Sequence, residues 1–252
     1  MHVFVLKGDF ELLDAYVPRL FELGARGLEE KPGEVWAYFP VRLELPLPGR
    51  WRELPDEDWL EAYKRDLKPV VAGPFVVLAP WHDWTGPERR IVLEPGMAFG
   101  TGHHVTTRMA LEALAAEHPS GKRVLDVGTG SGILAIAAAL LGAVALGVDT
   151  DASVVPVARE NARKNGVAPE FRVGSVEVAE PPYDLLVANL YAELHAELAP
   201  AYARLLVPGG RAHLTGVLAE RAPLVRRALA GAGLGFVGER CEGEWALLSF
   251  ER

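Results

Sequence analysis

The sequence predicts an α/β protein, in which a doubly wound parallel sheet with helices on both faces follows a small N-terminal α+β domain. Beyond residue 68, short apolar runs alternate with segments of helical periodicity. Runs such as VLDVG and LLVANL are apolar throughout, which is typical of parallel strands that are covered on both faces. Before residue 54, separate strand and helix patterns end in a proline-rich break, which indicates a second, smaller domain.

Composition narrows the class of protein. The 252 residues are half hydrophobic and carry a formal net charge of −8, and both the first 53 residues and the remainder are net negative. We therefore expect no direct nucleic-acid binding, because a basic surface is missing. No apolar run reaches the ~18 residues of a membrane span and no secretory signal is visible, so we expect a cytoplasmic protein without membrane contact. We also expect a monomer. The single cysteine, Cys241, excludes an intramolecular disulfide and a thiolate metal cluster.

Residues 1–53 are expected to form the small domain. HVFVL alternates as a strand does, and residues 11–24 have apolar side chains at helical spacing before a glycine suited to end a helix. Residues 35–45, VWAYFPVRLEL, are predicted to be further strand. Two prolines and a glycine in LPLPG (45–49) then break the chain.

A helical linker is expected over residues 54–68. Its sequence PDEDWLEAYKRDL has acidic residues in the first turn and Lys64 and Arg65 near the end, a distribution that favours a helix through its dipole. Residues 69–252 follow as the large domain.

The large domain is expected to alternate strands and helices. Strands are predicted at 69–73, 75–79, 90–94, 122–128, 143–149, 170–175, 183–190 and 211–217, with a closing hairpin over 236–250. Helices are predicted over 104–119, 131–142, 152–166 and 220–233, with one more helical segment between the last two of the listed strands. In such a sheet, ligands bind beyond the carboxyl ends of the strands, where the strand order reverses, so candidate site residues are sought there.

A glycine-rich loop follows the strand VLDVG. Gly128 and Gly130 allow a ligand to lie against bare backbone, and Gly132 allows the start of the next helix to pack close to the strand. A tight turn without a ligand is the alternative, which three glycines after one buried strand make less favourable. The dinucleotide fingerprint fails because Ile133 stands where its last glycine is required, and no P-loop is present. Asp126, just before the loop, would repel a pyrophosphate and suits a ligand that bears positive charge or hydroxyls.

Two acids follow the next strand. Asp149 ends it, 21 residues beyond Gly128, where a carboxylate can accept hydrogen bonds from both hydroxyls of a ribose. Helix capping is the alternative role, and we assign that role to Asp151, which directly precedes a helical segment.

Asn189 stands where the apolar strand at 183–190 meets the loop over the ligand crevice. Its amide donates and accepts, so it can position a neutral nitrogen or the amino-acid part of a ligand. Asparagine is equally common in turns, and the residue alone leaves both interpretations open.

Together, the loop glycines, Asp149 and Asn189 resemble the ligand-binding residues of class I S-adenosylmethionine-dependent methyltransferases. The block EPGMAFGTGHHVTT (94–107), followed by VLDVGTGSGILAIAAALLGA, GVDTD and ANL, narrows the resemblance to the ribosomal protein L11 methyltransferase family. The resemblance spans roughly residues 91–216. The chain departs from the family's usual pattern at four positions, none of which removes an evident ligand-binding atom: Glu94, His103, Val105 and Thr129.

The resemblance implies S-adenosylmethionine as the cofactor and transfer of its methyl group to amines of a ribosomal protein of the large subunit. The amines implied are lysine side chains and an N-terminal amine, and Asn189 is the candidate that positions them. Cofactor contacts are implied at nine residues: Phe99, Gly100, Thr101, His104, Thr107, Gly128, Gly130, Asp149 and Asn189.

The resemblance also assigns tasks to larger segments. AFGTG is expected to form a lid that closes over the cofactor, with glycines as hinges. The domain of residues 1–53 is expected to recognise the protein substrate. No metal site is expected, because adjacent residues such as His103 and His104 seldom bind one ion and the sequence offers no nearby carboxylate or cysteine.

Two alternatives stay open from the sequence. A small-molecule methyltransferase of the same fold would use its small domain to enclose the pocket rather than to dock a protein. A non-catalytic nucleoside-binding module is disfavoured by the presence of Asp149 together with both glycine-rich segments.

Overall fold

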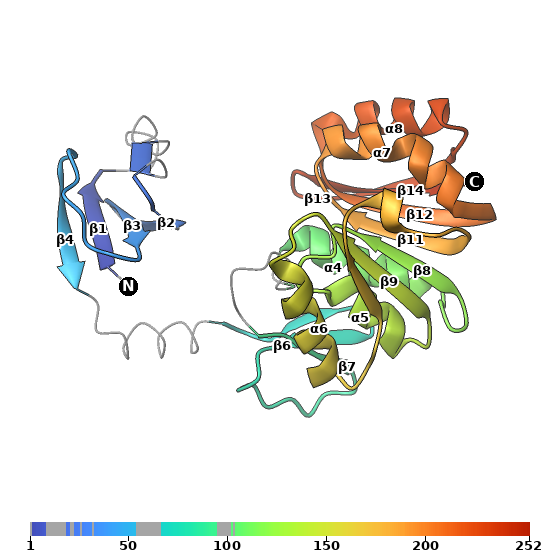
Figure 1. Ribbon diagram of the computed structural model, residues 1–252, viewed down its shortest axis with the longest axis horizontal. Coiled ribbons are helices and arrows are strands. Elements are labelled where there is room, and N and C mark those ends of the chain that lie inside the picture. Colours follow the sequence, from blue (N-terminus) through green and yellow to red (C-terminus); the bar gives the residue numbers. More distant parts are fainter. Residues whose placement is uncertain are drawn as a thin grey trace. The chain divides into compact units, whose positions relative to one another are not determined.

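The structure, a computed structural model, describes residues 2–8, 19–20, 23–25, 27–31, 33–53, 67–94, 102 and 104–252. The chain divides into two compact units, Met1–Leu67 and Lys68–Arg252 (Figure 1). Each unit has a hydrophobic core of its own. Nearly all of the predicted linker helix at 54–68 lies outside the described residues, as does most of the predicted helix at 11–24.

Unit Met1–Leu67 contains an antiparallel sheet in the order β2-β3-β1-β4. Its strands are β1 (His2–Lys7), β2 (Gly27–Lys31), β3 (Glu34–Phe39) and β4 (Gly49–Glu53). In β3 every second residue is buried, as the alternating pattern predicts, and Phe39 joins Phe4 and Leu6 in the core.

The prediction for this unit was wrong in two respects. The expected strand at 35–45 ends at Phe39, because Pro40 has no N–H to donate to a ladder. The edge strands β2 and β4 were not predicted, since GLEEK and GRWRE lack the apolar alternation on which the prediction depended. Charged residues are common in edge strands, where they discourage pairing with another chain.

Unit Lys68–Arg252 is built on a seven-stranded sheet in the order β10-β9-β8-β11-β12-β14-β13. The strands are β8 (Arg123–Val127), β9 (Val144–Asp149), β10 (Glu170–Val173), β11 (Tyr183–Asn189), β12 (Leu206–Leu218), β13 (Gly235–Glu242) and β14 (Trp245–Glu251). The first five in spatial order are parallel, and the predicted closing hairpin adds β14 and β13 antiparallel. The strand order reverses between β8 and β11, so a ligand is expected beyond the carboxyl ends of these two strands.

The helices that the structure describes over this sheet are α4 (Val105–Ala116), α5 (Ile133–Leu140), α6 (Val154–Lys164), α7 (Ala192–Leu205) and α8 (Ala222–Gly231). Figure 1 shows α7 and α8 together on one face, and α4, α5 and α6 on the other. Two buried clusters match these faces, one that contains Tyr202 and Val225 and another that contains Leu111 and Ile136. The predicted doubly wound α/β architecture is therefore confirmed.

Smaller elements complete the unit. They are β5 (Val70–Ala72), β6 (Phe75–Leu78) and β7 (Arg89–Val92), which form a separate three-stranded sheet, and the 3-10 segments η2 (Val176–Val178) and η3 (Ala219–Arg221). The three strands confirm the predictions at 69–73, 75–79 and 90–94.

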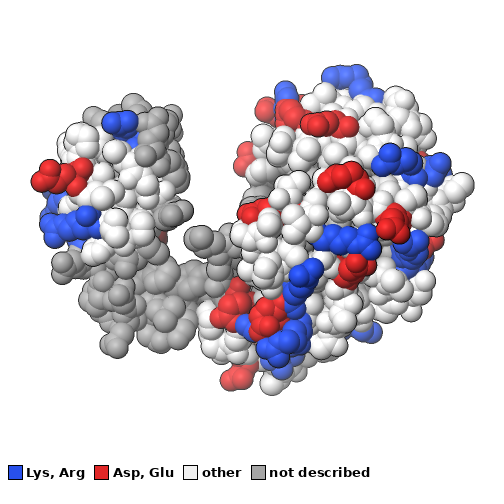
Figure 2. Space-filling model, in the orientation of Figure 1, with Lys and Arg blue, Asp and Glu red and all other residues white. Residues whose placement is uncertain are grey.

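Charges of both signs are interspersed on the face of this unit that Figure 2 shows. Surface ion pairs of this unit include Arg163 with Glu160 and Arg172 with Glu170. Among the helices that the structure describes, none is both long and apolar enough to cross a membrane.

Candidate active site

The glycine loop, residues 128–132, joins β8 to α5. Gly128, Gly130 and Gly132 all have positive φ, at 75°, 50° and 84°, a region that glycine enters readily and other residues rarely. A Cβ on Gly128 would lie 2.5 Å from Cδ2 of Leu190, so the backbone of the loop is in close contact with that side chain.

Gly132 lies close to two elements outside its own strand and helix. A Cβ at this position would lie 3.0 Å from Cβ of Ala158 in α6 and 3.0 Å from Cζ of Phe171 in β10. The glycine therefore allows α6 and β10 to approach the loop closely, which the sequence did not indicate.

Asp126, near the end of β8, holds the glycine loop in place through hydrogen bonds of its buried side chain. Its Oδ2 accepts hydrogen bonds from Thr129 Oγ1 at 2.6 Å and from the backbone N–H of Ala135 at 3.1 Å. Its Oδ1 is buried and has no hydrogen-bond partner among the residues that the structure describes. Burial raises the pKa of this carboxyl to about 7, although both hydrogen bonds favour the charged form.

Asp149 lies at the end of β9, next to the glycine loop. Its Oδ2 accepts from the backbone N–H of Gly130 at 2.9 Å, and its Oδ1 accepts from that of Asp151 at 3.0 Å. A carboxylate oxygen has two lone-pair sites, so each oxygen keeps capacity for one further donor. The half-buried carboxylate can therefore hold the loop and still accept from two ligand hydroxyls.

Asp151, to which the sequence assigns helix capping, lies two residues before the capping residue of α6, Ser153. Oδ1 of Asp151 accepts from the backbone N–H of Ser153 at 2.8 Å, and hydrogen bonds from the side chain and the backbone of Ser153 lower the pKa of the exposed carboxyl. The capping position of α6 itself is Ser153, whose side chain makes no capping bond.

Asn189 and Thr107 meet although they are 82 residues apart in sequence. Asn189 ends β11, and its Nδ2 donates to Oγ1 of Thr107 at 3.3 Å. Thr107 is buried in the first turn of α4. Because Leu190 contacts Gly128, this pair is joined to the glycine loop through the very next residue.

His104 occupies the N-cap of α4. Its Nδ1 lies 3.4 Å from the backbone N of Thr106, from which it accepts, and 2.7 Å from that residue's Oγ1. Its ring meets the ring of Trp245 edge to face, with centroids 4.8 Å apart. The cap role accounts for part of the histidine's position, and Trp245 of β14 is a neighbour that the sequence did not reveal.

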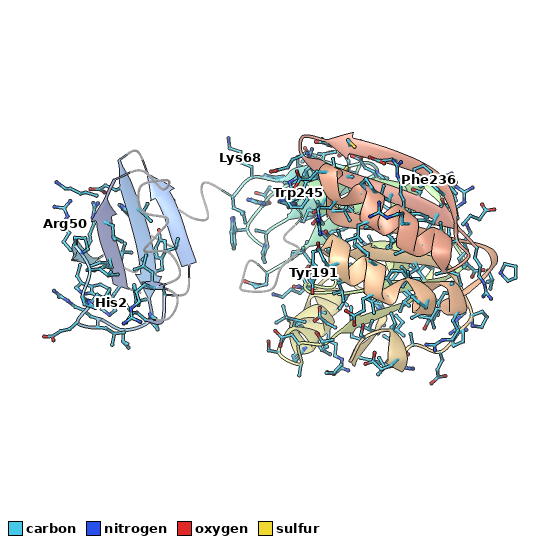
Figure 3. The ribbon with its side chains drawn as sticks, turned by 90° about the horizontal axis from the view of Figure 1, so that it is seen from above. His2, Arg50, Lys68, Tyr191, Phe236 and Trp245 are labelled. Atoms are coloured by element: carbon cyan, nitrogen blue, oxygen red, sulfur yellow. The ribbon has the colours of Figure 1, made fainter. Side chains whose placement is uncertain are left out.

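Sequence reasoning also missed Trp245, Tyr191 and Gly216, which lie at or near strand ends. Figure 3 labels Trp245 and Tyr191, and the latter is 60% exposed directly after Asn189 and Leu190. Gly216 of β12 has φ 78°, and a Cβ there would lie 2.6 Å from the carbonyl oxygen of Leu190. Only a glycine directly after the polar end of the strand RAHLT could have indicated this close approach.

Part of the predicted site lies outside the described residues. This applies to Phe99, Gly100 and Thr101 of the expected lid and to His103. Gly102 is described and is buried, with φ 83°, and a Cβ on it would lie 2.9 Å from Cγ1 of Val77 in β6.

Comparisons with known proteins agree with this geometry. The profile of the family described as "Ribosomal protein L11 methyltransferase (PrmA)" matches residues 41–252. The ribosomal protein L11 methyltransferase of Thermus thermophilus is 63% identical over 254 residues and covers all of both chains.

Solved structures are similar as well. The crystal structure of the ribosomal protein L11 methylase from Lactobacillus delbrueckii subsp. bulgaricus has a TM-score of 0.66 and 30% identity, over 71% of this chain and 93% of that one. Magnesium protoporphyrin IX methyltransferase from Synechocystis, solved with bound S-adenosylmethionine, has a TM-score of 0.50 and 20% identity over 63% of this chain and 86% of its own, which shows the shared fold alone.

The family of this chain follows from two of these matches: the similarity to the Thermus protein over the full length of both chains, and the family profile that matches residues 41–252. The chain belongs to the ribosomal protein L11 methyltransferase family of S-adenosylmethionine-dependent enzymes.

Proposed function

We propose that this chain transfers methyl groups from S-adenosylmethionine to amino groups of ribosomal protein L11, lysine side chains and the N-terminal amine. The observation that carries the proposal is the Asn189 amide, held by Thr107 at the end of β11 and linked to the glycine loop by Leu190. A neutral amide beside a nucleoside site suits an amine that must present its lone pair.

The residues of the site fit the cofactor. Asp149 retains acceptor capacity for the two ribose hydroxyls, and Gly128 and Gly130 present backbone without side chains. The unpartnered Oδ1 of Asp126, taken among the described residues, is an acceptor suited to a cationic or hydroxyl-bearing ligand, as its place before the loop predicts. Thr107 and His104 would contact the methionine part, and Phe99, Gly100 and Thr101 would close over it.

Positioning is the main task of the protein in this reaction. The sulfonium supplies an electrophilic methyl group, so a correctly held amine gains much of its rate from proximity and orientation. A lysine amine has a pKa of ~10.4 and must lose its proton before it can attack. Asn189 would hold the neutral amine by accepting from its N–H, with proton loss to water and desolvation beneath residues 96–102.

The two parts of the chain would divide recognition and chemistry. We assign residues 1–53 to substrate recognition, 54–68 to a linker and 69–252 to catalysis, and the division of the chain between Leu67 and Lys68 supports the boundary before the catalytic part. A cytoplasmic location, where a ribosomal protein is made, follows from the same proposal.

The test is the mass of ribosomal protein L11 after incubation with the enzyme and isotopically labelled S-adenosylmethionine. We expect labelled methyl groups on amines of L11, and a fragment of residues 69–252 that binds cofactor but methylates L11 poorly. Methylation only of small molecules, or of carboxylates or ring nitrogens, would contradict the proposed acceptor. Full activity of the fragment would contradict the role of residues 1–53.

A further inference from the structure

The Asn189 turn, residues 189–191, joins β11 to α7. Helix α7 contains a histidine that takes no part in the site described so far. His195 is completely buried. Its Nε2 lies 2.9 Å from the carbonyl oxygen of Thr215 in β12, and its Nδ1 lies 3.3 Å from the hydroxyl of Tyr202. Because a carbonyl can only accept, Nε2 carries the proton, and Nδ1 of the neutral ring accepts from the tyrosine.

The carbonyl of Thr215 serves a second donor as well. The backbone N–H of Leu190 donates to the same oxygen at 3.0 Å, and Asn189 pairs with Thr215 in the parallel ladder of β11 and β12. His195 therefore bonds to the same atom as the turn that follows Asn189. The hydroxyl of Thr215 donates to the carbonyl of Ala246 at 3.2 Å, which anchors this point to β14.

The Asn189 turn has little room to move from this position. A Cβ on Gly216 would lie 2.6 Å from the carbonyl oxygen of Leu190 and 2.7 Å from Oδ1 of Asn189. On its other side, Leu190 packs against Gly128 of the glycine loop. A small shift of the Thr215 carbonyl is thus transmitted to the amide of Asn189 and to the wall of the cofactor site.

We propose that His195 is a positioning residue for methyl transfer, which acts through the Thr215 carbonyl to set the place of the Asn189 amide. The proposal rests on the function assigned above to Asn189. Burial lowers the pKa of His195 to about 4, although hydrogen bonds to the backbone of Thr215 and Leu190 raise it, so the ring stays neutral near pH 7.

The test is a double-mutant cycle on kcat for methylation of L11, measured well below the Tm of every variant. His195→Phe removes the donor and is expected to lower kcat roughly 10-fold or more, since small misplacements of reacting groups have large effects on rate. The KM for L11 and the Kd for S-adenosylhomocysteine should change less than about threefold, because Asp149 and Gly130 are untouched. In the background of Asn189→Ala, His195→Phe should have little further effect on kcat.

Three further variants separate positioning from stability. His195→Gln retains an N–H donor and should restore most of kcat. Gly216→Ala should lower kcat in the same way without altering the histidine, because its methyl group displaces the turn. Leu205→Ala, fully buried near the end of the same helix, is the matched control, which should lower Tm while kcat stays at the wild-type value.

The outcomes distinguish this inference from the proposed function. If Asn189→Ala lowers kcat but His195→Phe does not, or if the two effects are additive, the role of His195 is overturned and that of Asn189 stands. If Asn189→Ala leaves kcat unchanged, the proposed role of Asn189 fails and the inference fails with it. If Leu205→Ala lowers kcat as strongly as His195→Phe, the effect is one of stability alone and the inference is overturned.

Discussion

Replacement of Asp149 by alanine should weaken cofactor binding while the domain stays folded. The carboxylate accepts from the backbone N–H groups of Gly130 and Asp151, and its remaining lone pairs are assigned to the ribose hydroxyls. In the ligand-free variant, water can reach the two N–H groups, because Asp149 is only half-buried. Once the ligand covers the site, the hydroxyls and the Gly130 N–H lack an acceptor.

The expected loss follows from these unpaired donors. Leaving a buried hydrogen-bonding group unsatisfied costs about 1–3 kcal/mol, which corresponds to a Kd for S-adenosylhomocysteine that rises roughly 5- to 150-fold. Isothermal titration calorimetry measures this directly, and NAD should not bind to either protein. Thermal unfolding without ligand reports any loss of fold.

Asp151→Ala is the matched control for this prediction. Asp151 lies in the same turn, but its side chain is exposed, and the partner described for its carboxylate is Ser153, through both its backbone and its side chain. The affinity of this variant for S-adenosylhomocysteine should equal that of the wild type. The ribose assignment is refuted if Asp149→Ala binds within twofold of wild type, or if Asp151→Ala weakens binding as much.

Three further predictions concern the glycine loop and the lid. Because Asp126 has its pKa raised from 3.8 to about 7 in the fold, the folded state holds the proton more tightly than the unfolded chain, so the free energy of unfolding should fall as pH rises from about 4 to 7. Asp126→Asn should flatten this part of a Tm–pH profile, and an unchanged slope would contradict the assignment. Gly132→Ala should lower stability by about 2–5 kcal/mol in chemical denaturation, since it combines a positive φ with a contact of 3.0 Å to Ala158, and a loss below 1 kcal/mol would show that α6 can move aside. Gly102→Val should lower kcat more than it lowers cofactor affinity, because φ 83° and the contact with Val77 disfavour any side chain there while the Asp149 contacts survive; equal losses in both would argue against a separate lid.

The strands and helices of the large unit were predictable because strands that are buried on both faces need continuous apolar runs, which are easy to recognise in the sequence. VLDVG and LLVANL leave few alternatives to buried parallel strands, and the helices between them show helical periodicity. The small unit was harder to predict, since β2 and β4 are edge strands whose charged residues carry no periodic apolar signal. Pro40 ended the predicted strand at 35–45 early, a signal that was present but outweighed by the apolar residues after it.

Part of the candidate site was also predictable from the sequence, and part was not. Gly128, Gly130 and Asp149 are close in sequence and follow adjacent strands, so their spacing alone indicated a nucleoside site. The contact of Leu190 with Gly128 and the bond from His195 to Thr215 depend on β11 lying beside β8 and on the approach of α7 to β12. Such contacts join distant segments, and no local pattern specifies them.

The strand order also sets a point in protein synthesis before which the site cannot exist. Chain emerging from the ribosome supplies Thr107 and the glycine loop early, but Asn189, the partner of Thr107, follows 82 residues later. The carbonyl that holds the turn after Asn189 belongs to β12, which is synthesised later still. Since a ligand stabilises only the conformation that binds it, S-adenosylmethionine can gain its contacts with Asn189 and Thr107 only after β12 has joined the sheet, and before that point only Asp149 and the glycine loop can hold it. The full stabilisation by the cofactor would thus come late in the synthesis of the domain, when most of the sheet is already in place.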